Sequence, residues 1–279
     1  MQKIEMIVCD LDRTFLKSFF EAQPDNVRAA RAARERGVRV CACTARNGDL
    51  AARFIRSCGF DDVCAICNGV ALYDAPARHV VRTQAFTAEQ SRRIVALCVS
   101  MKLEFVFYTA DHTLYVPGFT PDSFQRAIDA QPQLPAHKQE AFVNCHTVEG
   151  LVQLLQQHAL LAMVFNRKEQ YPDAHVFRAL EELGIATVSA PDPGEFNLMP
   201  RGVDKGTGLS MLAAHYGIAP ETILALGDNA NDLPMLRAAG IGVAMGDGDA
   251  QLQRAADYVS CGYAQGGVAQ AIRRFVLDA

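Results

Sequence analysis

The sequence predicts an α/β fold in which a parallel sheet, covered by helices on both faces, is interrupted by an inserted α+β domain. Short apolar runs alternate with helical stretches in the first part of the chain, and this alternation returns near residue 205. Between these parts, neighbouring strands follow each other without a helix, which is typical of a mixed or antiparallel sheet. We therefore expect a core domain in two segments, 1–83 and 194–279, around an inserted domain at 84–193.

The first core segment contains three apolar runs that we expect to be buried strands. Gly37 and Gly59 each follow a helical stretch and mark its end. After the third run, the turn Asn68-Gly69 leads the chain into one more strand. In order, we expect strand 4–9, helix 26–36, strand 38–43, helix 50–58, strand 63–67 and strand 70–73. Alternation of this kind predicts parallel strands joined by right-handed crossovers.

The inserted domain and the second core segment are assigned from the same signals. In the inserted domain we expect helix 88–101, strands 104–109 and 113–116, helix 122–130, strand 141–145, helix 148–157, strand 160–165, helix 172–183 and strand 186–189. In the second core segment we expect helix 205–215, strand 222–226, helix 233–238, strand 241–244 and helix 268–277.

Composition excludes several classes of function. The 27 basic and 31 acidic residues leave a net charge of −4, which argues against nucleic acid as a partner. No run of 18 apolar residues occurs, and the N-terminus is typical of a first strand rather than a signal peptide, so we expect a cytoplasmic protein that does not bind membranes. Several of the nine cysteines lie in strand-like runs and are expected to be small core residues, namely Cys9, Cys41, Cys43, Cys64 and Cys67. The Cys64–Cys67 pair lacks partners for a zinc site.

Polar residues gather where the predicted parallel strands end. Open parallel sheets bind ligands outside the carboxyl ends of their strands, so these residues are expected to converge on one crevice. Singly, each could be an ordinary helix cap, a turn residue or a solvated lysine, and it is their joint occurrence that favours a site. The clusters are Asp10, Asp12 and Thr14 after the first strand, Thr44 and Arg46 after the second, Lys205 at a helix start, and Asp228, Asn231 and Asp232 after strand 222–226.

The residue types in these clusters favour phosphoryl chemistry. Asp10, Asp12 and Asp228 are hard oxygen ligands that repel one another without a cation, and Mg²⁺ suits such a site. Lys205 could hold a phosphoryl group together with the hydroxyls of Thr14 and Thr44. A carboxylate can attack phosphorus to give an aspartyl phosphate, and a second carboxylate can transfer a proton to the leaving oxygen. A small phosphorylated metabolite is therefore the expected partner.

These motifs, in this order, resemble those of the haloacid dehalogenase superfamily, and the chain is most similar to its Cof-like phosphatases of subclass IIB. The stretches that carry the resemblance are Asp10–Thr14, Thr44, Asn68-Gly69, 202–206, the most specific stretch 227–236, and 266–269. The resemblance covers residues 4 to about 276 and implies a Rossmann-like core with an inserted cap domain. The family usually has glycine where this chain has Arg13, and commonly where it has Ala45.

The resemblance also implies roles for individual residues. Asp10 would be the nucleophile and Asp12 the general acid and base, while Thr44 and Lys205 would hold the phosphoryl oxygens. Mg²⁺ would be held by Asp10, the backbone carbonyl of Asp12, Asp228 and the nearby Asp232. The further substrate-binding candidates are Thr14, Arg46, Asn68, Glu195, Asn197 and Asn231.

The position of the insertion distinguishes among related enzymes. The inserted domain lies between Thr44 and Lys205, as in Cof-like phosphatases and sugar phosphomutases with a large α/β cap. The expected function is a Mg²⁺-dependent phosphatase that acts on small metabolites, with sugar phosphates as the favoured class. A sugar phosphomutase of the same architecture and a catalytically dead, binding-only relative are the alternatives. A signalling receiver domain is disfavoured because receivers are single short domains.

Overall fold

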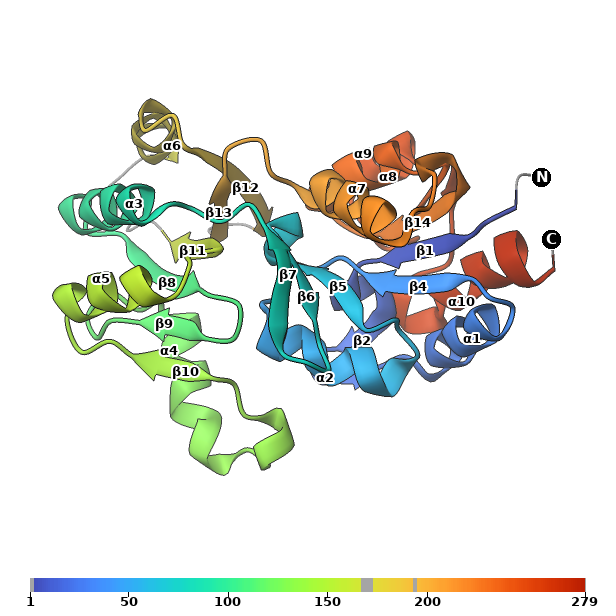
Figure 1. Cartoon of the computed structure of the whole chain (residues 1–279), viewed down its shortest axis with the longest axis horizontal. Coiled ribbons are helices and arrows are strands. Elements are labelled where there is room, and N and C mark those ends of the chain that lie inside the picture. The colour runs from blue at the N-terminus through green and yellow to red at the C-terminus, as the bar shows by residue number, and fades with distance from the viewer. Residues whose placement is uncertain (1–2, 167–172, 193–194, 279) are drawn as a thin grey trace. The chain divides into compact units, whose positions relative to one another are not determined.

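The computed structural model describes residues 3–166, 173–192 and 195–278. The chain forms two compact units, of which the first comprises Met1–Arg82 and Asp204–Ala279 and the second comprises Thr83–Val203 (Figure 1). The predicted fold class, an α/β core with an inserted α+β domain, is confirmed. None of the helices in the described ranges is long and apolar enough to span a membrane.

The core unit is built on a parallel sheet with β1 (Met6–Cys9) inside it. The five strands follow the order β16-β15-β14-β1-β4, and every described pair in this sheet is parallel. All four residues of β1 are buried, as expected for a strand with both faces covered. The other strands are β4 (Arg39–Ala42), β14 (Ile223–Gly227), β15 (Ile241–Ala244) and β16 (Tyr258–Val259).

Helices cover both faces of this sheet (Figure 1). One face packs on α7 (Lys205–Tyr216), α8 (Leu233–Ala238) and α9 (Ala250–Ala255), which share an apolar cluster with β1 and β4. On the other face lie α1 (Pro24–Glu35) and α10 (Gly267–Ile272), which pack against each other. The helix expected at 268–277 changes at Arg273 into a wider turn that ends at Leu277.

The third predicted strand, β5 (Val63–Ile66), differs from expectation. It meets the parallel sheet through one bridge, between Cys43 and Ala65, and its other side pairs antiparallel with β6 (Ala71–Asp74). A strand that we did not predict, β7 (His79–Thr83), completes this group of three. The helix α2 (Gly48–Cys58) connects β4 to β5 and is closed by Gly59, as predicted. Gly59 adopts the left-handed conformation.

The inserted unit contains a six-stranded mixed sheet. Its order is β10-β9-β8-β11-β13-β12, and its described pairs are antiparallel except for the parallel pair β9–β10. The strands are β8 (Glu104–Tyr108), β9 (Thr113–Tyr115), β10 (Phe142–Asn144), β11 (Ala162–Asn166), β12 (Ala186–Asp192) and β13 (Glu195–Pro200). The helices are α3 (Ala88–Ser100), α4 (Asp122–Ala130), α5 (Val148–Gln157) and α6 (Asp173–Glu182).

The expected return to the core at residue 194 lies too early in the chain. Strand β13 pairs with β11 and β12 in the inserted sheet, so the second core segment begins at Asp204. The apolar face of β13 explains this, because Phe196 and Leu198 are buried in the core of the inserted unit. The alternation of helices and apolar strands that is typical of the core resumes only with α7, so it does not mark the boundary at residue 194.

Candidate active site

The candidate site begins where β1 ends. Asp10 follows directly after Cys9, and its backbone N–H donates to the carbonyl of Leu226 at 3.0 Å, which ties it to the end of β14. The chain then makes one wide turn over Leu11–Phe15, in which the N–H of Leu16 returns to the carbonyl of Leu11. The rigid end of a buried strand therefore positions the Asp10 carboxylate, and the turn carries the next polar residues.

Lys205 is brought to the same place by the start of α7. Asp204 caps this helix, since its carboxylate accepts the N–H of Thr207 at 2.9 Å. The turn at Gly69 lies against the helix start, where a Cβ would collide with the carbonyl of Asp204 and lie 2.7 Å from the N of Gly208. Gly69 also has a φ of +87°, so glycine is required there for both space and conformation.

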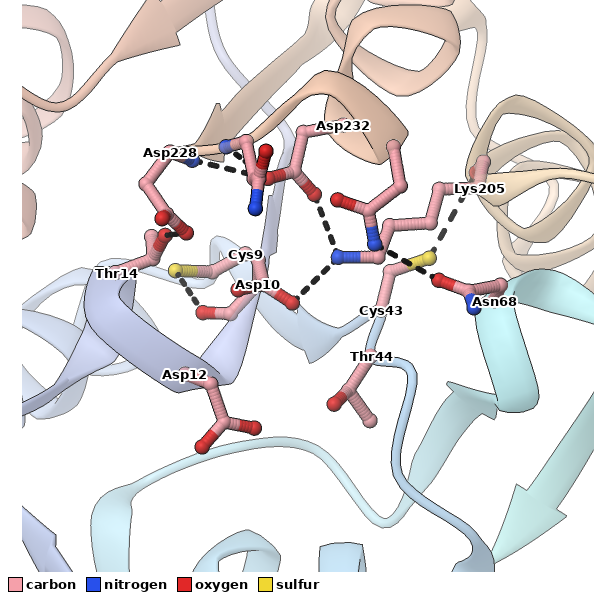
Figure 2. Close-up of polar contacts among 12 residues, drawn as sticks. Cys9, Asp10, Asp12, Thr14, Cys43, Thr44, Asn68, Lys205, Asp228 and Asp232 are labelled. Atoms are coloured by element: carbon pink, nitrogen blue, oxygen red, sulfur yellow. Dashed lines mark hydrogen bonds and ion pairs between the residues drawn. The ribbon is translucent and has the colours of Figure 1, made fainter. Parts of the chain in front are cut away.

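The ammonium of Lys205 lies between two buried carboxylates, as Figure 2 shows. Its Nζ is 2.6 Å from Oδ1 of Asp10 and 2.6 Å from Oδ1 of Asp232. The Lys205 side chain is only 2% exposed. Burial lowers the pKa of Lys205, but Asp10 and Asp232 outweigh this effect and hold the pKa above its ordinary value. Lys205 is therefore a buried cation, not a solvated helix residue.

Asp228 and Asp232 are held by the loop after β14. Oδ2 of Asp232 accepts the backbone N–H groups of Asp228 and Asn229, at 2.9 and 3.0 Å. The hydroxyl of Thr14 donates to Oδ1 of Asp228 at 2.9 Å, which joins the two ends of the site (Figure 2). Burial raises the pKa of Asp228 to about 6, and the neighbouring Asp232 adds to this shift.

Three of these carboxylates are placed to share one cation. Ligand oxygens of Asp10, Asp228 and Asp232 lie within 4.8 Å of one another, and all three residues are buried. Burial raises the pKa of Asp10 well above its ordinary value; Lys205 opposes this shift and Asp232 adds to it. Three carboxylates against one buried ammonium leave an excess negative charge of two, which matches one divalent cation. Hard oxygen ligands suit Mg²⁺, so the residues present fit the implied ion.

The side chain of Asp12 is outside this cluster and is held by Arg46. Nε of Arg46 is 2.7 Å from Oδ2 of Asp12, and Nη2 is 2.6 Å from Oδ1. The buried guanidinium contacts the rings of Phe19 and Phe54, while the Asp12 side chain is 42% exposed. In the structure Arg46 contacts Asp12, and its expected role in substrate binding stays a prediction.

The other core candidates form a polar border around the cluster. The Thr44 hydroxyl accepts the N–H of Arg46 at 3.1 Å, so it also shapes the loop after β4. Asn231 donates through Nδ2 to Oδ1 of Asn68 at 3.0 Å, which connects the loop after β14 to the turn before β6. The structure thus brings together residues from five separate stretches of the chain.

Arg13 departs from the family pattern and has an unusual backbone. Its φ is +57°, a conformation that favours glycine. The side chain is 56% exposed, and Nε lies 3.8 Å from Oδ2 of Asp228. The arginine therefore directs its positive charge toward one of the three clustered carboxylates.

Two expected substrate-binding residues belong to the inserted unit. Asn197 is buried in β13, opposite Val164 of β11. The backbone of Glu195 pairs in the same strand, and its side chain lies outside the described part of the structure. Their roles toward a substrate therefore remain predictions.

The Cys64–Cys67 pair is part of the apolar interior. Both thiols are free and buried, and burial raises the pKa of Cys64 to about 12. A thiol with so high a pKa is a poor nucleophile and a poor metal ligand. The assignment of these cysteines to the core agrees with this environment.

Two residues that contact Arg46 in the site were not identified from the sequence. Phe19 and Phe54 enclose the Arg46 guanidinium at 4.2 and 5.0 Å from their ring centroids to Cζ. Phe54 lies on the apolar face of α2, so its position in the sequence indicates only a core residue. Phe19 stands between two very short strands, β2 (Leu16–Ser18) and β3 (Glu21–Ala22), which carry no periodic signal. The available signal was the pair of adjacent aromatic residues, Phe19 and Phe20, between the first strand and the first helix.

Comparison with known proteins agrees with this architecture. A sequence model of the haloacid dehalogenase-like hydrolase family matches residues 7–272. The pyridoxal phosphate phosphatase YbhA of Escherichia coli is 26% identical, over 91% of this chain and 92% of YbhA. The chloroplastic endoribonuclease YBEY of Arabidopsis thaliana is 24% identical over 98% of this chain, which spans only 47% of that protein. The solved structure of the subclass IIB sugar phosphatase BT4131 superposes with a TM-score of 0.76 at 20% identity, covering 97% of this chain and 98% of that one.

Proposed function

The chain belongs to the haloacid dehalogenase-like hydrolases, in the Cof-like phosphatase group, and on this premise we propose that it hydrolyses phosphate monoesters of small metabolites with Mg²⁺ as cofactor. One observation carries the proposal: the buried Lys205 ammonium bridges Asp10 and Asp232 beside Asp228. Such a group of charges can bind a phosphoryl group and a divalent cation together. Sugar phosphates are the substrate class expected from the sequence.

In the proposed reaction Asp10 attacks the phosphorus atom. One carboxylate oxygen forms a bond to phosphorus, the ester P–O bond breaks, and an aspartyl phosphate results. Asp12 gives a proton to the departing alcohol oxygen, a step that requires the acid form of Asp12 with its protonated oxygen released from the Arg46 fork. Asp12 then accepts a proton from the water that attacks the aspartyl phosphate, and inorganic phosphate and free Asp10 are produced.

Lys205 and the clustered carboxylates would stabilise the transition state in different ways. Lys205 supplies a fixed positive charge within hydrogen-bond distance of Asp10, where negative charge gathers on the transferred group. Asp10, Asp228 and Asp232 would hold Mg²⁺, with the backbone carbonyl of Asp12 as a further ligand. When bound, the ion would neutralise the phosphoryl oxygens and reduce the repulsion between phosphate and carboxylates.

The decisive experiment concerns the attacking group. We expect phosphate release from a panel of phosphorylated metabolites to require Mg²⁺, and Asp10→Asn to abolish turnover because the amide cannot attack phosphorus. Hydrolysis in ¹⁸O-labelled water of a thiophosphate monoester made chiral with ¹⁶O and ¹⁷O should retain the configuration at phosphorus, because two successive displacements each invert it. Inversion of the configuration would show a single, direct attack by water and would overturn the covalent mechanism.

A further inference from the structure

The short hairpin that follows the Leu11–Phe15 turn has two aromatic residues at its tip. Strands β2 and β3 are joined at Phe19 and Phe20, whose rings meet edge to face at 4.9 Å. Turns of this size ordinarily use glycine, asparagine or aspartate, so aromatic side chains here are not explained by turn conformation. Phe19 is 43% exposed, and it is one of few large apolar side chains exposed in the described ranges.

The Phe19 ring is fixed next to Asp12 by the same arginine. Cζ of Arg46 lies 4.2 Å from the ring centroid, and Nη2 donates to the Phe19 carbonyl at 2.9 Å. That same nitrogen donates to Oδ1 of Asp12 at 2.6 Å. One buried guanidinium therefore places a half-exposed carboxylate and a half-exposed aromatic ring side by side. The ring is held before any ligand arrives, which lowers the entropic cost of using it.

We propose that Phe19 is a specificity-determining residue that contacts the leaving group, and that it favours alcohols whose ring presents a flat apolar face. This proposal rests on the proposed function, in which Asp12 protonates the leaving oxygen. Proton transfer requires that oxygen within hydrogen-bond distance of Asp12, so the carbon skeleton attached to it lies near the Phe19 ring. Both an aromatic ring and the C–H face of a pyranose fit this contact, and an open-chain alcohol gains less from it.

Three substrates with primary-alcohol leaving groups test the contact: benzyl phosphate, glucose 6-phosphate and glycerol 3-phosphate. Their leaving alcohols need protonation to a similar extent, so differences in kcat/KM among them reflect contacts with the carbon skeleton. We expect Phe19→Ala to lower the ratio of kcat/KM for a ring substrate to that for glycerol 3-phosphate by about three- to tenfold. The loss should appear in KM rather than kcat, because the ring contact is equal in ground and transition states. The two ring substrates show whether the aromatic or the sugar face is preferred.

Phe20→Ala is the matched control, because it removes a ring from the same turn and leaves the Phe19 ring in place. In this variant the ratio of kcat/KM for a ring substrate to that for glycerol 3-phosphate should equal the wild-type ratio. Unchanged ratios for both ring substrates in Phe19→Ala would overturn the proposal. An equal fall in kcat for all three substrates would also overturn it, because Phe19 would then act only by supporting Arg46. Failure of the proposed function looks different: the wild type would release phosphate from none of the three.

Discussion

Both carboxylate oxygens of Asp12 are bound by the fork of Arg46, with Nε 2.7 Å from Oδ2 and Nη2 2.6 Å from Oδ1. Arginine is suited to this task because its planar donors match the carboxylate geometry, and its charge persists at every accessible pH. The pair fixes the orientation of Asp12, although that side chain remains half exposed. Arg46 is therefore expected to be a positioning residue for proton transfer.

Arg46→Lys should reduce activity in a way that depends on the leaving group. Lysine keeps the charge but cannot make two parallel hydrogen bonds, so Asp12 loses its fixed orientation. Turnover of an alkyl phosphate, which needs a proton on its alcohol, should fall about tenfold to a hundredfold. Turnover of phenyl phosphate should fall much less, because phenolate, with a pKa of about 10, leaves more easily. Equal losses on both substrates would point to a general disturbance of the site.

Asp228→Ala should remove the response of the fold to Mg²⁺. An ion that binds only the folded state raises Tm as its concentration increases, and this effect requires the clustered carboxylates. We expect Mg²⁺ to raise Tm in the wild type and in Asp62→Ala, an exposed carboxylate at the start of β5. The Asp228→Ala protein should show no such increase, and it should lose activity by several orders of magnitude. A full Mg²⁺ response in that variant would contradict the assignment.

Lys205→Ala should weaken both folding and catalysis. The ammonium pairs with two buried carboxylates, and breaking a buried ion pair by removing one partner costs about 3–5 kcal/mol. Urea unfolding should report a loss of this size, and kcat should fall at least about a hundredfold. Lys205→Arg should restore little, because the larger fork cannot occupy the space between Asp10 and Asp232. Wild-type activity in the arginine variant would show that only a charge is needed there.

Arg13→Gly should increase the affinity for Mg²⁺. The arginine directs its charge toward Asp228, at 3.8 Å, and a fixed positive charge near a cation site repels the ion. Glycine also adopts the positive φ of this position without strain, so folding should not suffer. Titration of Tm with Mg²⁺ should give a Kd several times lower than in the wild type. An unchanged or higher Kd would show that the side chain does not influence the ion.

The fold was largely predictable because its strands and helices carry strong local signals. Helices α4 and α5 begin and end at the predicted residues, and glycine ends α2 as expected. The two-residue and three-residue strands of the β2–β3 hairpin were not predicted, since so short a segment has no measurable period. Strand β13 was placed in the wrong unit, because its pairing with β11 depends on contacts far along the chain.

The site could be predicted in its residues but not in its contacts. Strand ends and residue types indicated Asp10, Lys205 and Asp228, which the structure brings together. Which carboxylate Lys205 contacts is decided by the path of the backbone, in particular by the close approach of Gly69 to α7. Arg46 was expected to face the substrate, and only the folded loops show that Asp12 occupies its donors.

The division of the core unit into two distant segments has a consequence for biosynthesis. Strand β1 pairs with β4 early in the chain, but its other neighbour, β14, is made only after the whole inserted unit. The contact between Asp10 and Lys205 spans 195 positions, so a ribosome must translate most of the message before the two can meet. The inserted unit, Thr83–Val203, is continuous and has an apolar core of its own, so it can fold during this interval. Until then one edge of β1 stays unpaired, and an unpaired strand edge can pair with a neighbouring chain.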